Sequence, residues 1–195
     1  MTNDLTALLD RLYADDAAQR AAGLPSAQRT RNVERETGEW LRLLALATDA
    51  RSILEIGSSN GVSTLWLAAA ARGTGGRVTG TELLPERAAA ANANLAAAGL
   101  GDVARVIAGE ARTSVAALVG PFDLVFIDAE KDDYIGHFEA VVGKVRPNGL
   151  ILADNVISHD LSAYQAALRA RPDIETVTIP IGRGVEFSVV RGTYG

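Results

Sequence analysis

The chain has 195 residues, 48% of them hydrophobic and 22% charged, which is the composition of one water-soluble globular domain, residues 1–195. It contains no cysteine and two histidines, which excludes disulfides, thiolate metal sites and a cysteine nucleophile and leaves little material for histidine-based metal sites. A net charge of −5 argues against a nucleic-acid partner, and no apolar run reaches the ~20 residues of a membrane span, so neither partner is expected.

Two helices are predicted before the first strand. Leucines recur at helical spacing from Leu5 to Leu12, which predicts a helix up to about Ala22 that Gly23 and Pro25 end. A second amphipathic helix is predicted over Glu36–Thr48. These N-terminal helices form either a dimer interface or a lid, and we expect a homodimer. The N-terminus has no signal-peptide pattern, so a cytoplasmic location is expected.

Strands and helices alternate through the core, residues 52–190. Apolar runs predict strands at Ser52–Ile56, Arg77–Thr81, Val103–Ala108, Asp123–Ile127 and Leu150–Ala153. Helical patterns lie between them, at Val62–Arg72, Pro85–Ala98, Thr113–Val119 and Asp133–Lys144. The predicted fold is α/β, a doubly wound, mostly parallel, Rossmann-like sheet. Ile174–Ile179 and Val185–Val190 are separated by too few residues for a parallel crossover, which predicts an antiparallel pair at one end.

A glycine-containing turn follows the first strand. Gly57 and Gly61 allow a tight turn and a close approach of a ligand to the backbone. The second strand ends at Glu82, whose carboxylate can accept both hydroxyls of a ribose. In a sheet of this kind ligands bind at the carboxyl ends of the strands, so the two features together indicate a nucleoside site.

Two other sites fit the same turn less well. A dinucleotide site favours Gly-x-Gly-x-x-Gly, whereas Ser59 occupies the place of the second glycine. Gly57–Gly61 also matches the Gly-x-Ser-x-Gly nucleophile elbow of α/β-hydrolases, with Ser59 as nucleophile and His159 and Asp128 or Asp154 as partners. That fold places several strands before the elbow, and here the turn follows the first strand.

Acidic and amide side chains follow two later strands. Asp128 comes directly after one buried strand, and Asp154 and Asn155 come after the next. Neighbouring strands bring these side chains together, and two carboxylates with an amide oxygen suit a hard cation such as Mg²⁺. The alternative is that each aspartate caps the helix that follows it.

These linked motifs resemble the cation-dependent O-methyltransferases that use S-adenosylmethionine, the family of catechol and caffeoyl-CoA O-methyltransferases. The resemblance extends from about Val33 to Val190 and rests on residues 55–57, 61–63, Glu82, 109–111, 122–131 and 154–156. It implies a class I methyltransferase fold with S-adenosylmethionine as cofactor, a divalent cation, most simply Mg²⁺, and a small phenolic or catechol-like acceptor.

The resemblance also implies a role for individual residues. Val33 and Ser63 would hold the methionine part of the cofactor, and Glu55, Gly57 and Ser59 would line the turn beneath it. Glu82 would bind the ribose, and the turn from Gly109 to Ala111 would meet the adenine. The cation would be held by Asp128, Asp154 and Asn155, with Asp128 also close to the cofactor's amine, and Lys131 would be the general base.

Two departures from the family bear on the acceptor. The turn between the last two strands reads Gly182-Arg183-Gly184, where relatives often carry aspartate before the second glycine. The stretch 156–161 is too short for the loop with which relatives bind coenzyme A esters, which favours a small, free phenol. His137 is interpreted as a packing residue. A cofactor-binding protein without catalysis is the alternative from a different functional class.

Overall fold

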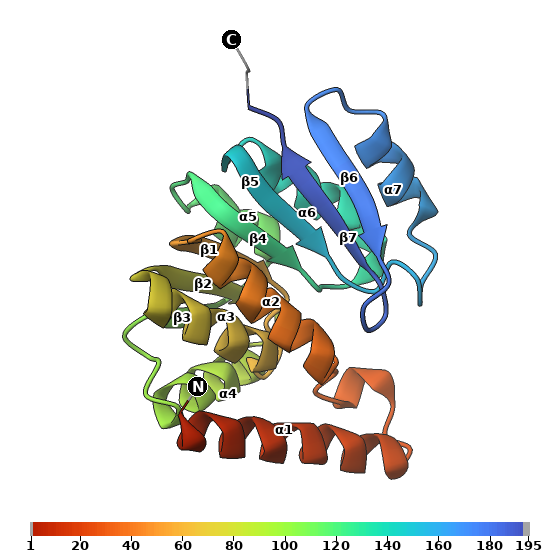
Figure 1. Cartoon of the computed structure of the whole chain (residues 1–195). Helices are drawn as coiled ribbons and strands as arrows, with labels where there is room; N and C mark the ends of the chain where they lie inside the picture. Colours follow the sequence, from red (N-terminus) through yellow and green to blue (C-terminus); the bar gives the residue numbers. More distant parts are fainter. Residues whose placement is uncertain (1, 193–195) are drawn as a thin grey trace.

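The computed structural model describes residues 2–192, and its described strands form one sheet in the order β3-β2-β1-β4-β5-β7-β6 (Figure 1). The first five strands are parallel to their neighbours, and β7 is antiparallel to both β5 and β6. The strands are β1 (Ser52–Ile56), β2 (Arg77–Glu82), β3 (Ala104–Ala108), β4 (Phe122–Ile127), β5 (Val145–Ala153), β6 (Ile174–Ile179) and β7 (Val185–Val190).

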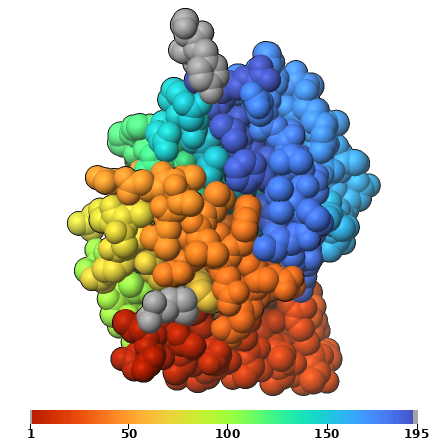
Figure 2. Space-filling model, viewed as in Figure 1, coloured from red at the N-terminus to blue at the C-terminus, as the bar shows by residue number. Residues whose placement is uncertain are grey.

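Helices pack on both faces of this sheet. One hydrophobic cluster joins the inner sides of α1, α2, α3 and α4 to one face, and a second joins α5, α6 and α7 to the other. In Figure 2, α1 forms the base of the molecule in this view, below α2. The helices are α1 (Asn3–Ala21), α2 (Arg35–Ala47), α3 (Val62–Thr74), α4 (Pro85–Ala97), α5 (Ala111–Ala116), α6 (Tyr134–Val142) and α7 (Ser162–Arg169), with single 3-10 turns η1 (Ser26–Gln28) and η2 (Lys131–Asp133).

Helices cover both faces of the sheet, which explains why a central strand such as β4 has apolar side chains on both sides. In β4, Leu124 and Phe126 belong to one cluster, and Val125 and Ile127 belong to the other. All four side chains are fully buried. A strand that alternated apolar and polar residues would place polar groups in one of these cores, so the observed pattern requires helices on both sides. Within the described residues, no helix is both long enough and apolar enough to cross a membrane.

The predicted doubly wound sheet is confirmed, with differences at its C-terminal part. The antiparallel strand β7 is last in the chain but lies inside the sheet, and β6 forms the edge. Strand β5 begins at Val145, five residues before the predicted start, and its pairing with β4 shifts between Phe122 and Leu124. Helix α7 was not predicted at all. It has eight residues, and its buried members, Tyr164 and Leu168, are four residues apart and pack in the second hydrophobic cluster. A helix this short depends on such packing for its stability.

Candidate active site

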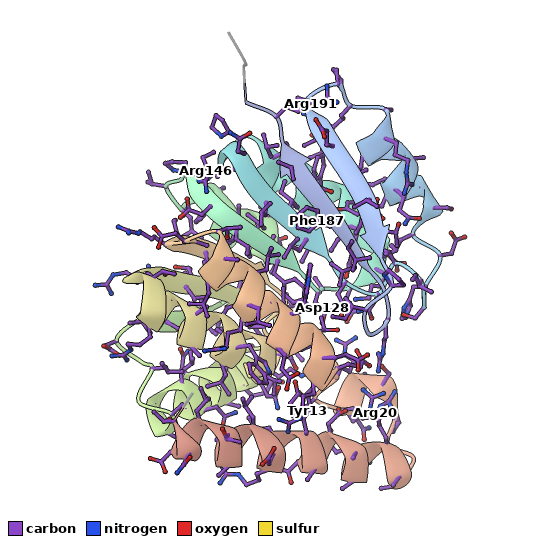
Figure 3. All side chains as sticks on the ribbon, in the orientation of Figure 1. Tyr13, Arg20, Asp128, Arg146, Phe187 and Arg191 are labelled. Atoms are coloured by element: carbon purple, nitrogen blue, oxygen red, sulfur yellow. The ribbon has the colours of Figure 1, made fainter. Side chains whose placement is uncertain are left out.

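The candidate site lies at the carboxyl ends of the parallel strands. Pairing aligns the last residue of β1, Ile56, with Ile127 of β4, and aligns Ile127 with Ala153 of β5. The amide of Asp128 donates to Ile56 O (2.9 Å), and the amide of Asp154 donates to Ile127 O (3.0 Å). The ladder therefore continues one residue past each strand and fixes both aspartates side by side. Figure 3 shows Asp128 at the end of the sheet that faces the N-terminal helices.

A cavity of about 670 Å³ opens at this edge. Its wall includes the turn after β1, the ends of β2, β4 and β5, the start of α5, and parts of the N-terminal segment between α1 and α2. A cavity of this size accommodates a ligand as large as a nucleoside derivative.

The turn after β1 requires glycine at position 57. Its φ of +91° lies in the left-handed region, and a Cβ placed there would be 2.3 Å from the carbonyl oxygen of Asp128. Ser59 also has a positive φ, +46°, and its amide donates to the Glu82 carboxylate (2.8 Å). The turn and the acid at the end of β2 therefore form one unit.

Two glutamates lie below this turn and differ in exposure to the cavity. Glu82 lines the cavity and accepts from the amides of Ser59 and Leu84, which fixes its carboxylate while leaving further lone pairs for a ligand. Glu55 is fully buried, accepts from the hydroxyls of Ser58 and Thr64, and does not line the cavity. Burial raises the pKa of Glu55, while the hydroxyl contacts lower it. Glu55 therefore supports the turn from behind.

An acidic pair occupies the ends of β4 and β5. Asp154 is 1% exposed, and its Oδ1 has no hydrogen-bond partner in the described structure. Burial and the negative charge of Asp128 raise the pKa of Asp154 to about 8. Asn155 donates from Nδ2 to Asp128 Oδ1 (3.3 Å), and its own amide oxygen accepts no hydrogen bond from described residues. Asp128, Asp154 and Asn155 thus bring two carboxyl groups and an amide to the same edge of the sheet, where the negative charge is only partly compensated.

Lys131 is the cation that contacts this pair. Its Nζ donates to Asp128 Oδ1 (2.8 Å), to Ala129 O (2.9 Å) and to the hydroxyl of Tyr134 (2.9 Å). The Tyr134 hydroxyl in turn donates to Asp154 O (3.1 Å). An ammonium group has three N–H donors, and here each of them has an acceptor, so the side chain is held in one position.

The oxygen set fits a hard divalent cation. In the described part of the chain, no group of three or more His, Cys, Asp or Glu side chains is placed to hold a metal ion, because this cluster offers only two carboxylates. The third oxygen of the cluster belongs to the Asn155 amide. An unpaired buried carboxylate oxygen facing a second carboxylate is the arrangement that a cation would relieve. The residues therefore fit the predicted cation.

The segment between α1 and α2, residues 26–34, crosses the mouth of the cavity. The Ser59 hydroxyl donates to Thr30 O (2.5 Å), and Arg87 donates to Ala27 O (2.6 Å). Arg31 pairs with Glu130 (2.7 Å) beyond β4, and Glu34 pairs with Arg183 (2.6 Å) in the turn between β6 and β7. We call this segment the crossing segment. Only Val33 of this segment was predicted to contribute to the site. The other contacts were not predicted, because the segment carries no motif and acts through residues distant in sequence.

The cavity brings together eight of the residues predicted from sequence: Gly57, Ser59, Glu82, Ala111, Asp128, Lys131, Asp154 and Asn155. Four others do not line the cavity: Val33, Glu55 and Ser63 are buried, and Gly109 is partly exposed. The sequence did not point to Arg31, Arg112 or His137, which also line the cavity, and single residues outside any motif leave no signal in one sequence.

The described residues do not form the serine–histidine contact that the hydrolase alternative requires. The Ser59 hydroxyl donates to a backbone carbonyl, and neither histidine hydrogen-bonds to it within the described residues. His159 instead lies beside Ser158, with 3.0 Å between its Nδ1 and the Ser158 hydroxyl. Ser59 therefore holds the crossing segment and is not arranged as a nucleophile.

Comparison with known proteins gives one consistent group. A methyltransferase-domain family matches residues 54–156. A catechol O-methyltransferase of Mycobacterium tuberculosis is 40% identical over 158 residues, covering 80% of this chain and 68% of that protein. One from Niastella koreensis is 39% identical over 155 residues, covering 74% and 68%. A solved O-methyltransferase from Bacillus cereus in complex with SAH superposes with a TM-score of 0.81 at 29% identity, covering 95% of this chain and 91% of that one.

Proposed function

Because the chain belongs to the S-adenosylmethionine-dependent O-methyltransferases that include the catechol O-methyltransferases, we propose that it methylates a hydroxyl of a small catechol-like or phenolic acceptor and needs a divalent cation to do so. The observation that carries the proposal is the Asp128–Asp154 pair. Asp154 is buried, one of its oxygens is unpaired, and the pair stands at the same edge of the sheet as the glycine turn.

The residues at this edge divide into two groups. Gly57, Ser59 and Glu82 form the cofactor side, where Glu82 accepts from the ribose hydroxyls. Asp128, Asp154 and Asn155 form the cation side. When bound, the cofactor supplies a sulfonium-activated methyl group. A hard cation supplies positive charge that favours ionisation of an acceptor hydroxyl, whose pKa in a free phenol is about 10.

The remaining proton transfer falls to Lys131. Its Nζ lies between Asp128 and the Tyr134 hydroxyl, at the edge of the cavity, where it can take the acceptor proton once it has lost its own. Asp128, Asp154 and Asn155 would hold the cation, which would supply positive charge beside the acceptor hydroxyl. Tyr134 keeps Nζ in place during the exchange because its hydroxyl is itself anchored on Asp154 O.

The size of the cavity supports a small acceptor. A volume of about 670 Å³ has to contain both the cofactor and the acceptor. A single ring fits the remaining space better than a coenzyme A ester does, and His159 is the one described residue of the loop 156–161 that lines the cavity. The crossing segment is held against this edge by the contacts of Thr30 with Ser59 and of Arg31 with Glu130. A site shielded from water would favour a reaction in which a sulfonium and an oxyanion neutralise each other.

A panel of catechols and monophenols with labelled S-adenosylmethionine, assayed with and without Mg²⁺, tests the proposal. We expect turnover with catechols that EDTA abolishes and Mg²⁺ restores. Full activity after exhaustive chelation would remove the cation from the proposal, and cofactor binding without turnover on any acceptor would favour the non-catalytic alternative. The homodimer and cytoplasmic location expected from the sequence remain proposals, and sedimentation velocity tests the first.

A further inference from the structure

His137 is a buried side chain of the cavity wall without a partner. It lies on α6, 6% exposed, on the wall that Ala111 and Arg112 of α5 also line. Its Nδ1 is enclosed and has no hydrogen-bond partner. Its Nε2 is not enclosed in this way, and it too makes no hydrogen bond to the described residues. A buried polar group with no partner is uncommon and calls for an explanation.

The surroundings of His137 keep the ring neutral. Burial lowers the pKa of His137, and the charge of Arg112 acts in the same direction. Asp133 and Glu110 oppose this, but their effect is smaller than that of burial. A neutral imidazole carries one N–H donor and one bare nitrogen acceptor.

The enclosure of Nδ1 decides which nitrogen carries the proton. A buried N–H without an acceptor is rarer, and costs more, than an acceptor lone pair left unused. The proton therefore belongs on Nε2, and the bare lone pair belongs on Nδ1. This leaves an N–H donor on the ring atom that a ligand in the cavity can reach.

We propose that His137 donates its Nε2–H to a ring nitrogen of the cofactor's adenine. The inference rests on the proposed function, in which Glu82 holds the ribose. Ala111, Arg112 and His137 line the same cavity as Glu82, and this wall is where the adenine would lie if Glu82 holds the ribose. Adenine has three ring nitrogens at its edges that can accept, N1, N3 and N7, so a single donor on this wall can bind the base through one of them.

Isosteric analogues of the reaction product test this directly. S-adenosylhomocysteine and its 1-deaza, 3-deaza and 7-deaza analogues each differ by one ring nitrogen, and calorimetry measures their affinity without turnover. We expect the wild type to bind one of the three about tenfold more weakly than S-adenosylhomocysteine, as loss of one acceptor from a buried donor predicts. His137→Phe keeps a flat ring, should bind S-adenosylhomocysteine about tenfold more weakly, and should no longer distinguish that analogue.

Two further variants separate recognition from packing. His137→Gln carries an N–H near the position of Nε2 and should recover part of the discrimination. His159→Phe changes the other histidine, which is exposed, lies beside Ser158 and is on a different element from His137, and should leave all four affinities unchanged.

The outcomes are distinct. Discrimination that survives in His137→Phe, or a uniform loss of affinity for all four compounds, would overturn the role of His137 and leave the proposed function standing. Failure of the wild type to bind S-adenosylhomocysteine at all would overturn both. Thermal unfolding of each variant shows whether it is folded under the conditions of the titration.

Discussion

Replacing Gly57 with alanine should disturb the site because of the Cβ atom that it adds. A Cβ at position 57 would stand 2.3 Å from the carbonyl oxygen of Asp128, about 1 Å short of normal contact. The neighbour is backbone, so it cannot rotate away. Gly75 is a matched control, because it is also left-handed, at φ +71°, and no described atom lies within 4 Å of its Cβ position.

The two substitutions share a backbone cost and differ in the clash. A left-handed alanine costs roughly 1–2 kcal/mol, part of which the stiffer unfolded chain offsets. Overpacking against a fixed neighbour adds about 1–3 kcal/mol. We therefore expect Gly75→Ala to lower the midpoint of thermal unfolding by a few degrees, and Gly57→Ala to lower it further, by about 2–4 °C for each added kcal/mol.

Urea unfolding and calorimetry with S-adenosylhomocysteine check both parts of this reasoning. Gly57→Ala should be the less stable variant and should also bind the ligand more weakly, because the clash moves Asp128 and the turn apart. Gly75→Ala should bind like the wild type. Equal loss of stability in the two variants, or unchanged binding in Gly57→Ala, would show that the close approach at Gly57 has no part in shaping the site.

Three further predictions concern the charged residues. Glu82→Ala should weaken S-adenosylhomocysteine binding by about 1–3 kcal/mol in calorimetry, since charged hydrogen bonds are lost; unchanged affinity would place the ribose elsewhere. Lys131→Met should lower turnover about 10²–10⁴-fold, with a smaller loss for more acidic phenols, whereas recovery at saturating Mg²⁺ would mean that Lys131 only supports the cation site. The amides of Arg112 and Thr113 lower the pKa of Glu110 from 4.5 to about 2, so its ionised form stabilises the fold above pH 4.5 and this contribution is lost as the pH falls toward 2. The difference in unfolding midpoint between wild type and Glu110→Gln should therefore shrink over that range.

The strands β1, β6 and β7 were predictable because the local sequence pattern agrees with the packing of the fold. Strand β1 begins and ends at the predicted residues, as do β6 and β7. Each of these is a short apolar or β-branched run between clear breaks, and in β1 the run is buried on both faces. The start of β5 was missed because Pro147, Asn148 and Gly149 form a turn signal that the neighbouring strand overrides by pairing Phe122 with Val145.

The site was predictable where it depends on strand ends and not where it depends on the crossing segment. Asp128 and Asp154 follow neighbouring strands, so the topology alone brings them together. Arg31 meets Glu130 across 99 residues of sequence, and Ser59 meets Thr30 across 29. Such contacts depend on the path of a loop, which composition and periodicity do not encode. His137 was predicted to pack, and its burial agrees, but its missing partner is visible only in three dimensions.

The insertion of β7 between β5 and β6 sets the order in which the sheet can be completed. Strand β6 pairs with β7 and not with β5, so it has no place in the sheet until the last strand arrives. The carbonyls of Arg183 and Gly184, just before β7, hold the amides of Val156, Ile157 and Ser158, next to Asn155. During synthesis the N-terminal strands emerge and pair first. The backbone contacts that follow Asn155 therefore form only after β7 has emerged from the ribosome, whereas Asp154 is already placed when β5 pairs with β4.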